Sequence, residues 1–277
     1  MLKLIADAGS TKIEWVVVEN KKVVKRLITS GYNPNYARPI AFIDILYKEM
    51  KHFPAVDAVY YYGSGCGSAF AQSETRQYLK VRFEEANEVV VTHDLMGAAH
   101  ALLDHKKGIA CILGTGANAC CYDGEDITNR AVSLGYLVGD EGSGCYIGRK
   151  LVRSYFYNLM PNDLQALFKE EVQLDYASFL DHVYRQPEPS KYLASFTHFA
   201  GKHQDHPFIH QLVSDAFDDF IEVFLLPFDG CHELPIGFVG SVAFHFKDIL
   251  RERLEVHGLH LDTVMVSPME GLIQRYS

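Results

Sequence analysis

Short apolar runs separated by polar turns recur along the chain and set its expected secondary structure. Residues 2–6, 13–18 and 23–29 have the length and character of strands, while apolar residues in 39–53 recur at helical spacing. A further strand-like run at 55–62 ends in a glycine-rich turn. Because strands alternate with helices, the sequence predicts an α/β protein with mixed sheets flanked by helices.

The same pattern restarts near residue 108, where an apolar run, a bare turn and a second apolar run follow one another again. Gly9 and Gly116 hold matching places in the two hairpins, 107 positions apart. This weak internal similarity predicts two related α/β domains, at residues 1–105 and 106–267. A closing helix is expected at 268–277, and the sequence alone does not decide whether it joins the first domain or the second. Other elements expected in the second half are helices at 142–160, 208–226 and 241–258 and strands at 234–240 and 262–267.

Composition narrows the classes of function. The chain has 277 residues, 48% of them hydrophobic, and a formal net charge of −9. That charge argues against a broad surface for DNA or RNA phosphates, so no nucleic-acid partner is expected. No stretch approaches the roughly 20 apolar residues of a membrane span, and the first residues lack the features of a signal peptide. We therefore expect a cytoplasmic protein whose six cysteines, none in a C-x-x-C pair, are reduced structural thiols.

The first bare turn, Asp7-Ala8-Gly9-Ser10-Thr11-Lys12, combines groups that bind phosphate. Gly9 leaves room for a ligand, and Ser10, Thr11 and the backbone N–H groups can hold phosphate oxygens, with Lys12 adding positive charge. Asp7 can hold a hydrated Mg²⁺ beside the phosphates. An ordinary hairpin turn, which favours the same residue types, is the alternative.

The second bare turn, Gly114-Thr115-Gly116-Ala117-Asn118, favours phosphate binding over an ordinary hairpin turn. It is not a Walker P-loop, because G-x-x-x-x-G-K-[ST] occurs nowhere in the chain. Two such hairpins, one in each half, could clamp a polyphosphate between two domains.

Asp94 follows the strand-like run EVVVTH and opens the apolar stretch LMGAAHALL. Thr92 is the expected helix N-cap, which leaves Asp94 in the first helical turn, where the helix dipole stabilises its ionised form. A carboxylate at the end of a strand is well placed to accept a proton from a substrate hydroxyl. The alternative is a purely stabilising acidic residue.

Two further glycine-rich junctions are candidate binding elements. In residues 139–144, GDEGSG, Asp140 and Glu141 lie among three glycines before a helix. A helix cap by Ser143 or Asp140 would account for only one carboxylate and two of the glycines. Gly240 and Ser241 join a strand to a helix, where a glycine lets the backbone approach a flat ligand such as adenine. A routine strand-to-helix junction is the alternative for this second turn.

Taken in order, these motifs resemble the actin–hexokinase superfamily of ATP-using proteins, and more closely its BadF/BadG/BcrA/BcrD ATPase family, which includes N-acetylglucosamine kinase. The resemblance covers essentially the whole chain and rests on DAGSTK, YGSGCG, THDLMGAAHA, LGTGAN, GYLVGDEGSG and VGSVA. It implies two ribonuclease-H-like, actin-like ATPase domains, each a mixed five-stranded sheet flanked by helices, with a nucleotide cleft between them.

The resemblance also implies site residues. The residues implied to contact ATP lie in the two hairpins and the last turn, and they are Asp7, Gly9, Ser10, Thr11, Lys12, Gly114, Thr115, Gly116, Gly240 and Ser241. Asp7 is implied to bind Mg²⁺ through water. Sugar contacts fall to Asn33, Ser64, Asp94, Thr115, Gly116, Asn118 and Asp140, with Asp94 as the catalytic base.

The implied activity is phosphorylation of the 6-hydroxyl of an N-acetylated amino sugar, N-acetylglucosamine or N-acetylmuramic acid, by a kinase that is a homodimer in many relatives. An ATPase that drives conformational change in a partner protein is the alternative, and a non-catalytic sensor is a third class. Ala8 and Ser10 depart from the usual glycine-rich first motif, and Leu113 stands where the iron–sulfur branch has a cluster cysteine. Arg130 and Arg149 are interpreted as solvated surface cations, with a lactyl carboxylate as the alternative partner.

Overall fold

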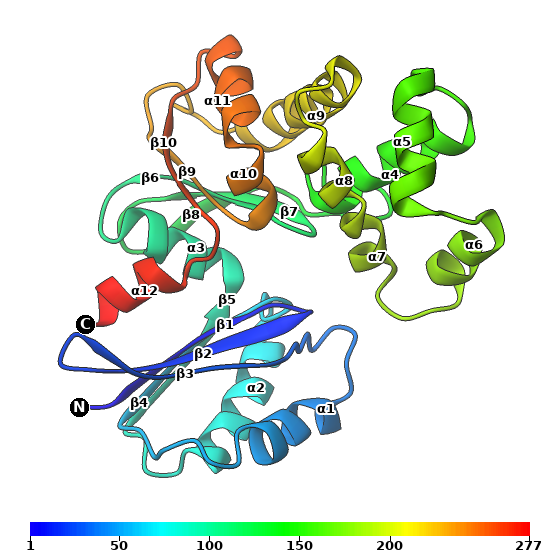
Figure 1. Ribbon diagram of the computed structural model, residues 1–277. Helices are drawn as coiled ribbons and strands as arrows, with labels where there is room; N and C mark the ends of the chain where they lie inside the picture. The colour runs from blue at the N-terminus through cyan, green and yellow to red at the C-terminus, as the bar shows by residue number, and fades with distance from the viewer. The chain divides into compact units, whose positions relative to one another are not determined.

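The computed structural model describes residues 1–277 and divides into two compact units. Unit 1 contains residues 1–106 and 267–277, and unit 2 contains residues 107–266. The chain therefore leaves unit 1 once and returns to it near its end, so that the C-terminal helix, red in Figure 1, belongs to the same unit as the blue N-terminal strands.

Unit 1 is built on a mixed five-stranded sheet with the order β3-β2-β1-β4-β5. β1 pairs antiparallel with β2, to which a tight hairpin joins it, and parallel with β4, which the chain reaches only after β3 and a helical segment at residues 39–49. The strands are β1 (Lys3–Ala8), β2 (Lys12–Glu19), β3 (Lys22–Ser30), β4 (Ala58–Gly63) and β5 (Glu88–His93).

Helices cover both faces of this sheet. They are α1 (Pro39–Asp44), the π-helical turn η1 (Ile45–Glu49), α2 (Ala69–Arg82), α3 (Asp94–Leu103) and α12 (Met269–Tyr276). Leu4, Ala6 and Ala8 of β1 share a core with α1, η1 and α2, whereas Ile5 shares a smaller core with α3 and α12. Since side chains alternate along a strand, Asp7 lies on the same face as Ile5, the face of α3 and α12.

The short helix α12 is held to unit 1 by several polar contacts. Lys3 Nζ donates to the backbone oxygen of Tyr276 at 2.7 Å, and the Tyr276 hydroxyl lies 2.5 Å from that of Tyr62. Arg275 donates to the Asp104 carboxylate at 2.7 Å. Gly271 permits close packing on α3, since a Cβ there would lie 2.3 Å from the carbonyl oxygen of Ala101.

Unit 2 repeats the plan with a second mixed five-stranded sheet, in the order β10-β9-β6-β7-β8. β6 pairs antiparallel with β7 and parallel with β9. The strands are β6 (Gly108–Leu113), β7 (Ala117–Tyr122), β8 (Ile127–Arg130), β9 (Ile236–Val239) and β10 (Leu261–Met265).

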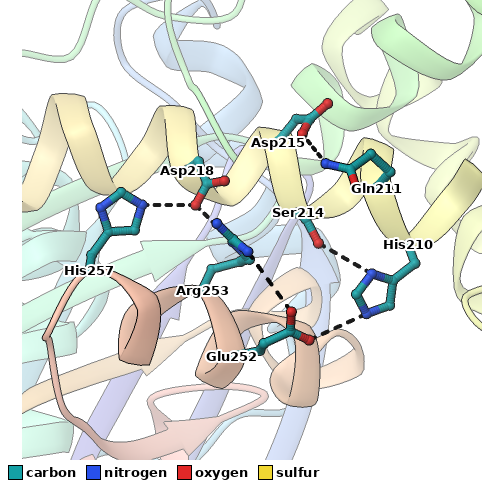
Figure 2. Close-up of polar contacts among 8 residues, drawn as sticks. All are labelled: His210, Gln211, Ser214, Asp215, Asp218, Glu252, Arg253 and His257. Atoms are coloured by element: carbon teal, nitrogen blue, oxygen red, sulfur yellow. Dashed lines mark hydrogen bonds and ion pairs between the residues drawn. The ribbon is translucent and has the colours of Figure 1, made fainter. Parts of the chain in front are cut away.

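The helices of unit 2 pack with this sheet around one apolar core. They are α4 (Gly144–Phe156), α5 (Asn162–Val172), α6 (Tyr176–Tyr184), α7 (Pro189–Ser195), α8 (Thr197–Lys202), α9 (Pro207–Phe220), the π-helical turn η2 (Ile221–Leu225), α10 (Ser241–His245) and α11 (Lys247–Val256). Figure 2 shows the polar contacts that join α9 to α11. Arg253 Nε donates to Asp218 at 2.9 Å, His257 Nε2 lies 2.9 Å from the same oxygen, and His210 pairs with Glu252.

The two mixed sheets flanked by helices confirm the predicted architecture, but several element boundaries were wrong. The helix expected at 241–258 breaks at Phe246, and the helix expected at 39–53 leaves α-geometry at Ile45. The sequence pattern missed β8, whose residues are mostly exposed, and α2, whose sequence is strongly polar. No helix of the chain has the length and apolar character needed to cross a membrane.

Candidate active site

The first hairpin presents its turn on a rigid support. Gly9 N donates to the Lys12 oxygen at 2.9 Å, and the chain after β3 closes against the turn, with Gly31 N bonded to the Thr11 oxygen at 3.1 Å. Gly31 is needed for this approach, since a Cβ there would lie 2.3 Å from the Ser10 oxygen. Ser10, Thr11 and Lys12 are exposed, so the hydroxyls and the ammonium group are accessible to a ligand.

Asn33 joins the first hairpin to the YGSG turn. Its Nδ2 donates to Ser10 Oγ at 3.0 Å, and its Oδ1 accepts from Asn35 N at 3.0 Å. Gly65 has a φ of +81° and packs on this amide, where a Cβ would lie 2.1 Å from Oδ1. Asn33 is therefore a buried support of Ser10 as well as a candidate sugar contact.

Asp94 is the first residue of α3, as expected, and its carboxylate is held from two sides. Ser64 Oγ donates to Oδ2 at 2.7 Å, and the Leu95 backbone N–H donates to Oδ1 at 2.9 Å. The expected N-cap was wrong. His93, not Thr92, caps the helix by accepting from Met96 N at 3.2 Å, because the strand continues through His93.

Asp7 lies among other carboxylates at the end of β1. Burial, followed by the charges of Asp94 and Glu14, raises the pKa of Asp7 to about 7, while the charge of Lys12 and the nearby Ser267 hydroxyl oppose the rise. Glu14 is the direct cross-strand partner of Asp7. The local charge is therefore negative, and a cation would relieve it.

In unit 2, the second hairpin is bonded to the start of α4. Gly144 N donates to the Gly114 oxygen at 2.8 Å, and Cys145 N donates to the Thr115 oxygen at 3.1 Å. Ser143 caps α4 by accepting from Tyr146 N at 3.2 Å. The GTGAN and GDEGSG motifs, which are distant in sequence, thus form one continuous structure.

Asp140 lies directly against this hairpin. It has a φ of +58°. Burial raises the pKa of Asp140 above its ordinary value. A Cβ at Gly116 would lie 3.0 Å from its Oδ2, so the glycine makes room for the carboxylate. Arg149, expected on the solvated surface, instead donates to the backbone oxygens of Tyr136 at 2.7 Å and Leu137 at 3.1 Å, within the loop before Asp140.

The turn at Gly240 also meets the second hairpin. Gly240 has a φ of +128°, and a Cβ there would lie 2.1 Å from the Leu113 oxygen and 3.0 Å from Gly114 N. Ser241 follows as the exposed first residue of α10. Thr115 is exposed in the hairpin turn, and Asn118, on β7, accepts from Ala119 N through Oδ1 at 2.9 Å.

The structure brings the expected residues into two groups, one in each unit. Unit 1 gathers Asp7, Gly9, Ser10, Thr11, Lys12, Asn33, Ser64 and Asp94, and unit 2 gathers Gly114, Thr115, Gly116, Asn118, Asp140, Gly240 and Ser241. Sequence reasoning missed Glu14, Ser267 and the role of Arg149. The alternation of side chains along β2 was the one sequence signal that could have placed Glu14 on the same sheet face as Asp7. No local sequence signal pointed to Ser267 or to the role of Arg149.

No family model matches the chain. The structure of a proposed N-acetylglucosamine kinase from Porphyromonas gingivalis is 38% identical, and the alignment covers 99% of this chain and 98% of that one with a TM-score of 0.94. A ROK-family glucokinase from Streptomyces griseus, solved with glucose and AMPPNP, is 14% identical over 99% and 98% of the two chains with a TM-score of 0.57, which shows a shared fold alone.

A curated relative, the N-acetylmuramic acid/N-acetylglucosamine kinase of Clostridium acetobutylicum, is 26% identical over 116 residues. That match spans 40% of this chain and only 38% of the relative's length. The family relationship therefore rests on the P. gingivalis protein, which aligns along nearly all of both chains. At that identity and coverage, the predicted resemblance is confirmed, and the chain belongs to the N-acetylglucosamine kinase-like family of ATP-dependent sugar kinases.

Proposed function

We propose that this protein transfers the γ-phosphoryl group of ATP to the 6-hydroxyl of an N-acetylated amino sugar, with Asp94 as the general base. The observation that carries the proposal is the placement of the Asp94 carboxylate at the start of α3, fixed by Ser64 and the Leu95 N–H. Family membership supports the kinase chemistry, and the name of the Clostridium relative suggests N-acetylglucosamine or N-acetylmuramic acid as the acceptor.

The two hairpins supply the groups that phosphates need. Exposed Ser10, Thr11 and Lys12 in unit 1 and the bare Gly114–Gly116 turn in unit 2 offer hydroxyls, an ammonium group and backbone N–H groups. Such donors stabilise the charge that develops on transferring phosphoryl oxygens. Gly240 packs closely against Leu113, so its backbone, without a side chain, lies beside the second hairpin. The adenosine part of ATP would bind next to this backbone.

The residues present fit a magnesium ion held chiefly by water and phosphate. No group of three or more His, Cys, Asp or Glu could hold a metal by itself, whereas Asp7 is a single carboxylate in a negative environment. Mg²⁺ commonly keeps several waters and binds through one or two carboxylates plus substrate phosphates. When bound, it would neutralise phosphate charge.

Asp94 would act on the sugar as a base and an orienting group. Each of its oxygens accepts one hydrogen bond from the protein, so lone pairs remain to receive the proton of a substrate hydroxyl. Phosphoryl transfer has a loose transition state and depends mainly on positioning, so the carboxylate needs no unusual basicity. Thr115, Asn118 and Asp140 would hold the other sugar hydroxyls and the N-acetyl group.

The direct test is ADP release by purified protein with Mg-ATP and one sugar at a time: N-acetylglucosamine, N-acetylmuramic acid, glucosamine or glucose. We expect one N-acetylated sugar to stimulate release strongly and its phosphate ester to appear by mass spectrometry. Steady hydrolysis that ignores every sugar would refute the proposal in favour of the partner-driven ATPase.

The raised pKa of Asp7 gives a pH prediction. Below about pH 7 the carboxyl takes up a proton, and the proton competes with the metal. The Mg²⁺ concentration for half-maximal activity should therefore rise by about tenfold in total as the pH falls from about 8 to 6, with most of the rise below pH 7. An Asp7→Asn variant should lose this pH dependence. Protonation of ATP itself would instead affect the variant and the unmodified protein equally. A flat profile in the unmodified protein would contradict the assignment of the metal to Asp7.

Arg149 gives a prediction about the sugar side. Arg149→Ala removes the hydrogen bonds that hold the loop before Asp140, so the KM for the sugar should rise about tenfold while the KM for ATP changes little. Arg153→Ala is the matched control, since Arg153 lies one turn further along α4 and stacks on exposed Tyr157. Equal effects of the two substitutions on the sugar KM would show that Arg149 has no special role.

A further inference from the structure

Asn33 is a buried polar residue in the segment that follows β3. Both ends of its side-chain amide have a partner. Its Oδ1 accepts a hydrogen bond from the Asn35 backbone N–H at 3.0 Å, and its Nδ2 donates to Ser10 Oγ at 3.0 Å. Because the Asn35 N–H can only donate, it fixes the amide with its oxygen toward Asn35 and its nitrogen toward Ser10.

The backbone around Asn33 is held against the first hairpin. Tyr32 N donates to the Gly9 oxygen at 3.2 Å, and the Tyr32 ring is buried in the core of unit 1. Gly65 packs on the other side of the amide, where even a Cβ would lie 2.1 Å from Asn33 Oδ1. The amide therefore cannot turn away from Ser10 unless the backbone moves.

This arrangement sets the direction of the Ser10 hydroxyl. Asn33 Nδ2 is a donor without acceptor capacity, so Ser10 Oγ is the acceptor of their hydrogen bond and its own proton is left to donate elsewhere. The Ser10 side chain is exposed beside Thr11 and Lys12. An ionised phosphate offers only acceptor oxygens, so a hydroxyl held in this way suits it as a donor.

We infer that Asn33 is a positioning residue for the first hairpin, which orients the Ser10 hydroxyl so that it donates to a phosphate oxygen of the bound nucleotide. The inference rests on the proposed function, because it takes this hairpin as a phosphate site. It goes beyond the sugar contact expected at Asn33, because it requires Asn33 to affect nucleotide binding when no sugar is present.

The test is a double-mutant cycle in the full-length protein. Calorimetry measures the affinity for a non-hydrolysable ATP analogue with Mg²⁺ and without sugar, so that a sugar contact of Asn33 plays no part. Asn33→Ala removes the donor to Ser10, and Ser10→Ala removes the hydroxyl. Asn33→Asp keeps the size of the side chain and the acceptor for Asn35 N, but its carboxylate only accepts, so the Ser10 hydroxyl would donate to it instead of to phosphate.

We expect Ser10→Ala to weaken analogue binding about tenfold, Asn33→Ala about fivefold and Asn33→Asp more than about tenfold. In the Ser10→Ala protein, Asn33→Ala should change the affinity by less than about twofold, because its partner is gone. In a Thr11→Ala protein, Asn33→Ala should still weaken binding about fivefold, since Nδ2 bonds to Ser10. Asn35→Ala removes an exposed side chain but keeps the backbone N–H, so it should bind like the unmodified protein.

A purely structural role of Asn33 predicts instead that Asn33→Ala weakens binding equally with and without the Ser10 hydroxyl. That result, or unchanged binding in both Asn33→Ala and Asn33→Asp, would overturn the inference. If Asn33→Ala does not fold, Asn33→Asp replaces it in the same cycle. The loss of affinity in Asn33→Asp should then be at least about threefold smaller in the Ser10→Ala protein.

Binding without sugar separates this inference from the proposed function. If the cycle shows the expected coupling but no sugar stimulates ADP release, the role of Asn33 stands and the sugar-kinase proposal fails. If sugar phosphorylation is observed but the losses in Asn33→Ala and Ser10→Ala simply multiply, the kinase proposal stands and the role of Asn33 fails. Absence of analogue binding to the unmodified protein would overturn both.

Discussion

Replacing Asp94 by asparagine is expected to lower kcat for sugar phosphorylation by about 10²–10⁴-fold, the usual contribution of a general base. The amide retains the size of the carboxylate and can still accept the hydrogen bond from Ser64, so the turn should keep its shape. It cannot accept the proton of the sugar hydroxyl. Binding of an ATP analogue, measured by calorimetry, should change by less than about twofold, because the proposed nucleotide contacts lie on the two hairpins.

A matched control is available on the same helix. Asp104→Asn removes an exposed carboxylate just beyond the end of α3, and its turnover should stay close to that of the unmodified protein. Substantial turnover in Asp94→Asn would contradict the assignment of the base. Equal losses in the two variants would point to a general effect on α3.

The second large effect is expected from Gly240→Ala, which should lower the free energy of unfolding by about 2–5 kcal/mol. Alanine is strained at a φ of +128°, and its Cβ would lie 2.1 Å from the Leu113 oxygen. The chain would have to move at the junction of β9 and α10, which also supports the Gly114 hairpin. Denaturant unfolding measures the loss, and ATP-analogue binding should weaken as well.

Gly201→Ala provides the control for Gly240→Ala. Gly201 lies in helix α8 of the same unit, where an added Cβ meets only the Phe246 ring at 3.8 Å. Because alanine favours the helix by about 1 kcal/mol over glycine, this variant should be as stable as the unmodified protein or more stable. If both substitutions destabilise equally, backbone conformation at Gly240 is not the cause.

The features that sequence reasoning located correctly depend on local chemistry. Each phosphate hairpin is an apolar run, a bare turn and another apolar run, so the sequence itself shows both the strands and the turn between them. Asp94 was placed in the first turn of its helix because the apolar stretch after it has helical character. Gly240 is predicted from its place at a strand-to-helix junction, and its positive φ and tight packing explain why glycine is required there.

The features that sequence reasoning missed depend on pairing across the fold. The proximity of Asp7 to Glu14 follows from the register of β1 and β2, which the turn length alone did not fix. Ser267 belongs to the same unit as Asp7 because the chain returns to unit 1 at this residue, near its far end. Arg149 looked like a surface cation because the carbonyl groups that it binds belong to an irregular loop.

The measurement that tests the central claim most directly is the position of the phosphate on the product. Purified protein would be incubated with Mg-ATP and N-acetylglucosamine or N-acetylmuramic acid, and with the 6-deoxy form of the same sugar as the control. We predict a phosphate ester whose ³¹P signal couples to the two protons on carbon 6, and no product from the 6-deoxy sugar. Phosphate on another carbon, or ADP release that is equal with the 6-deoxy sugar, would contradict the account.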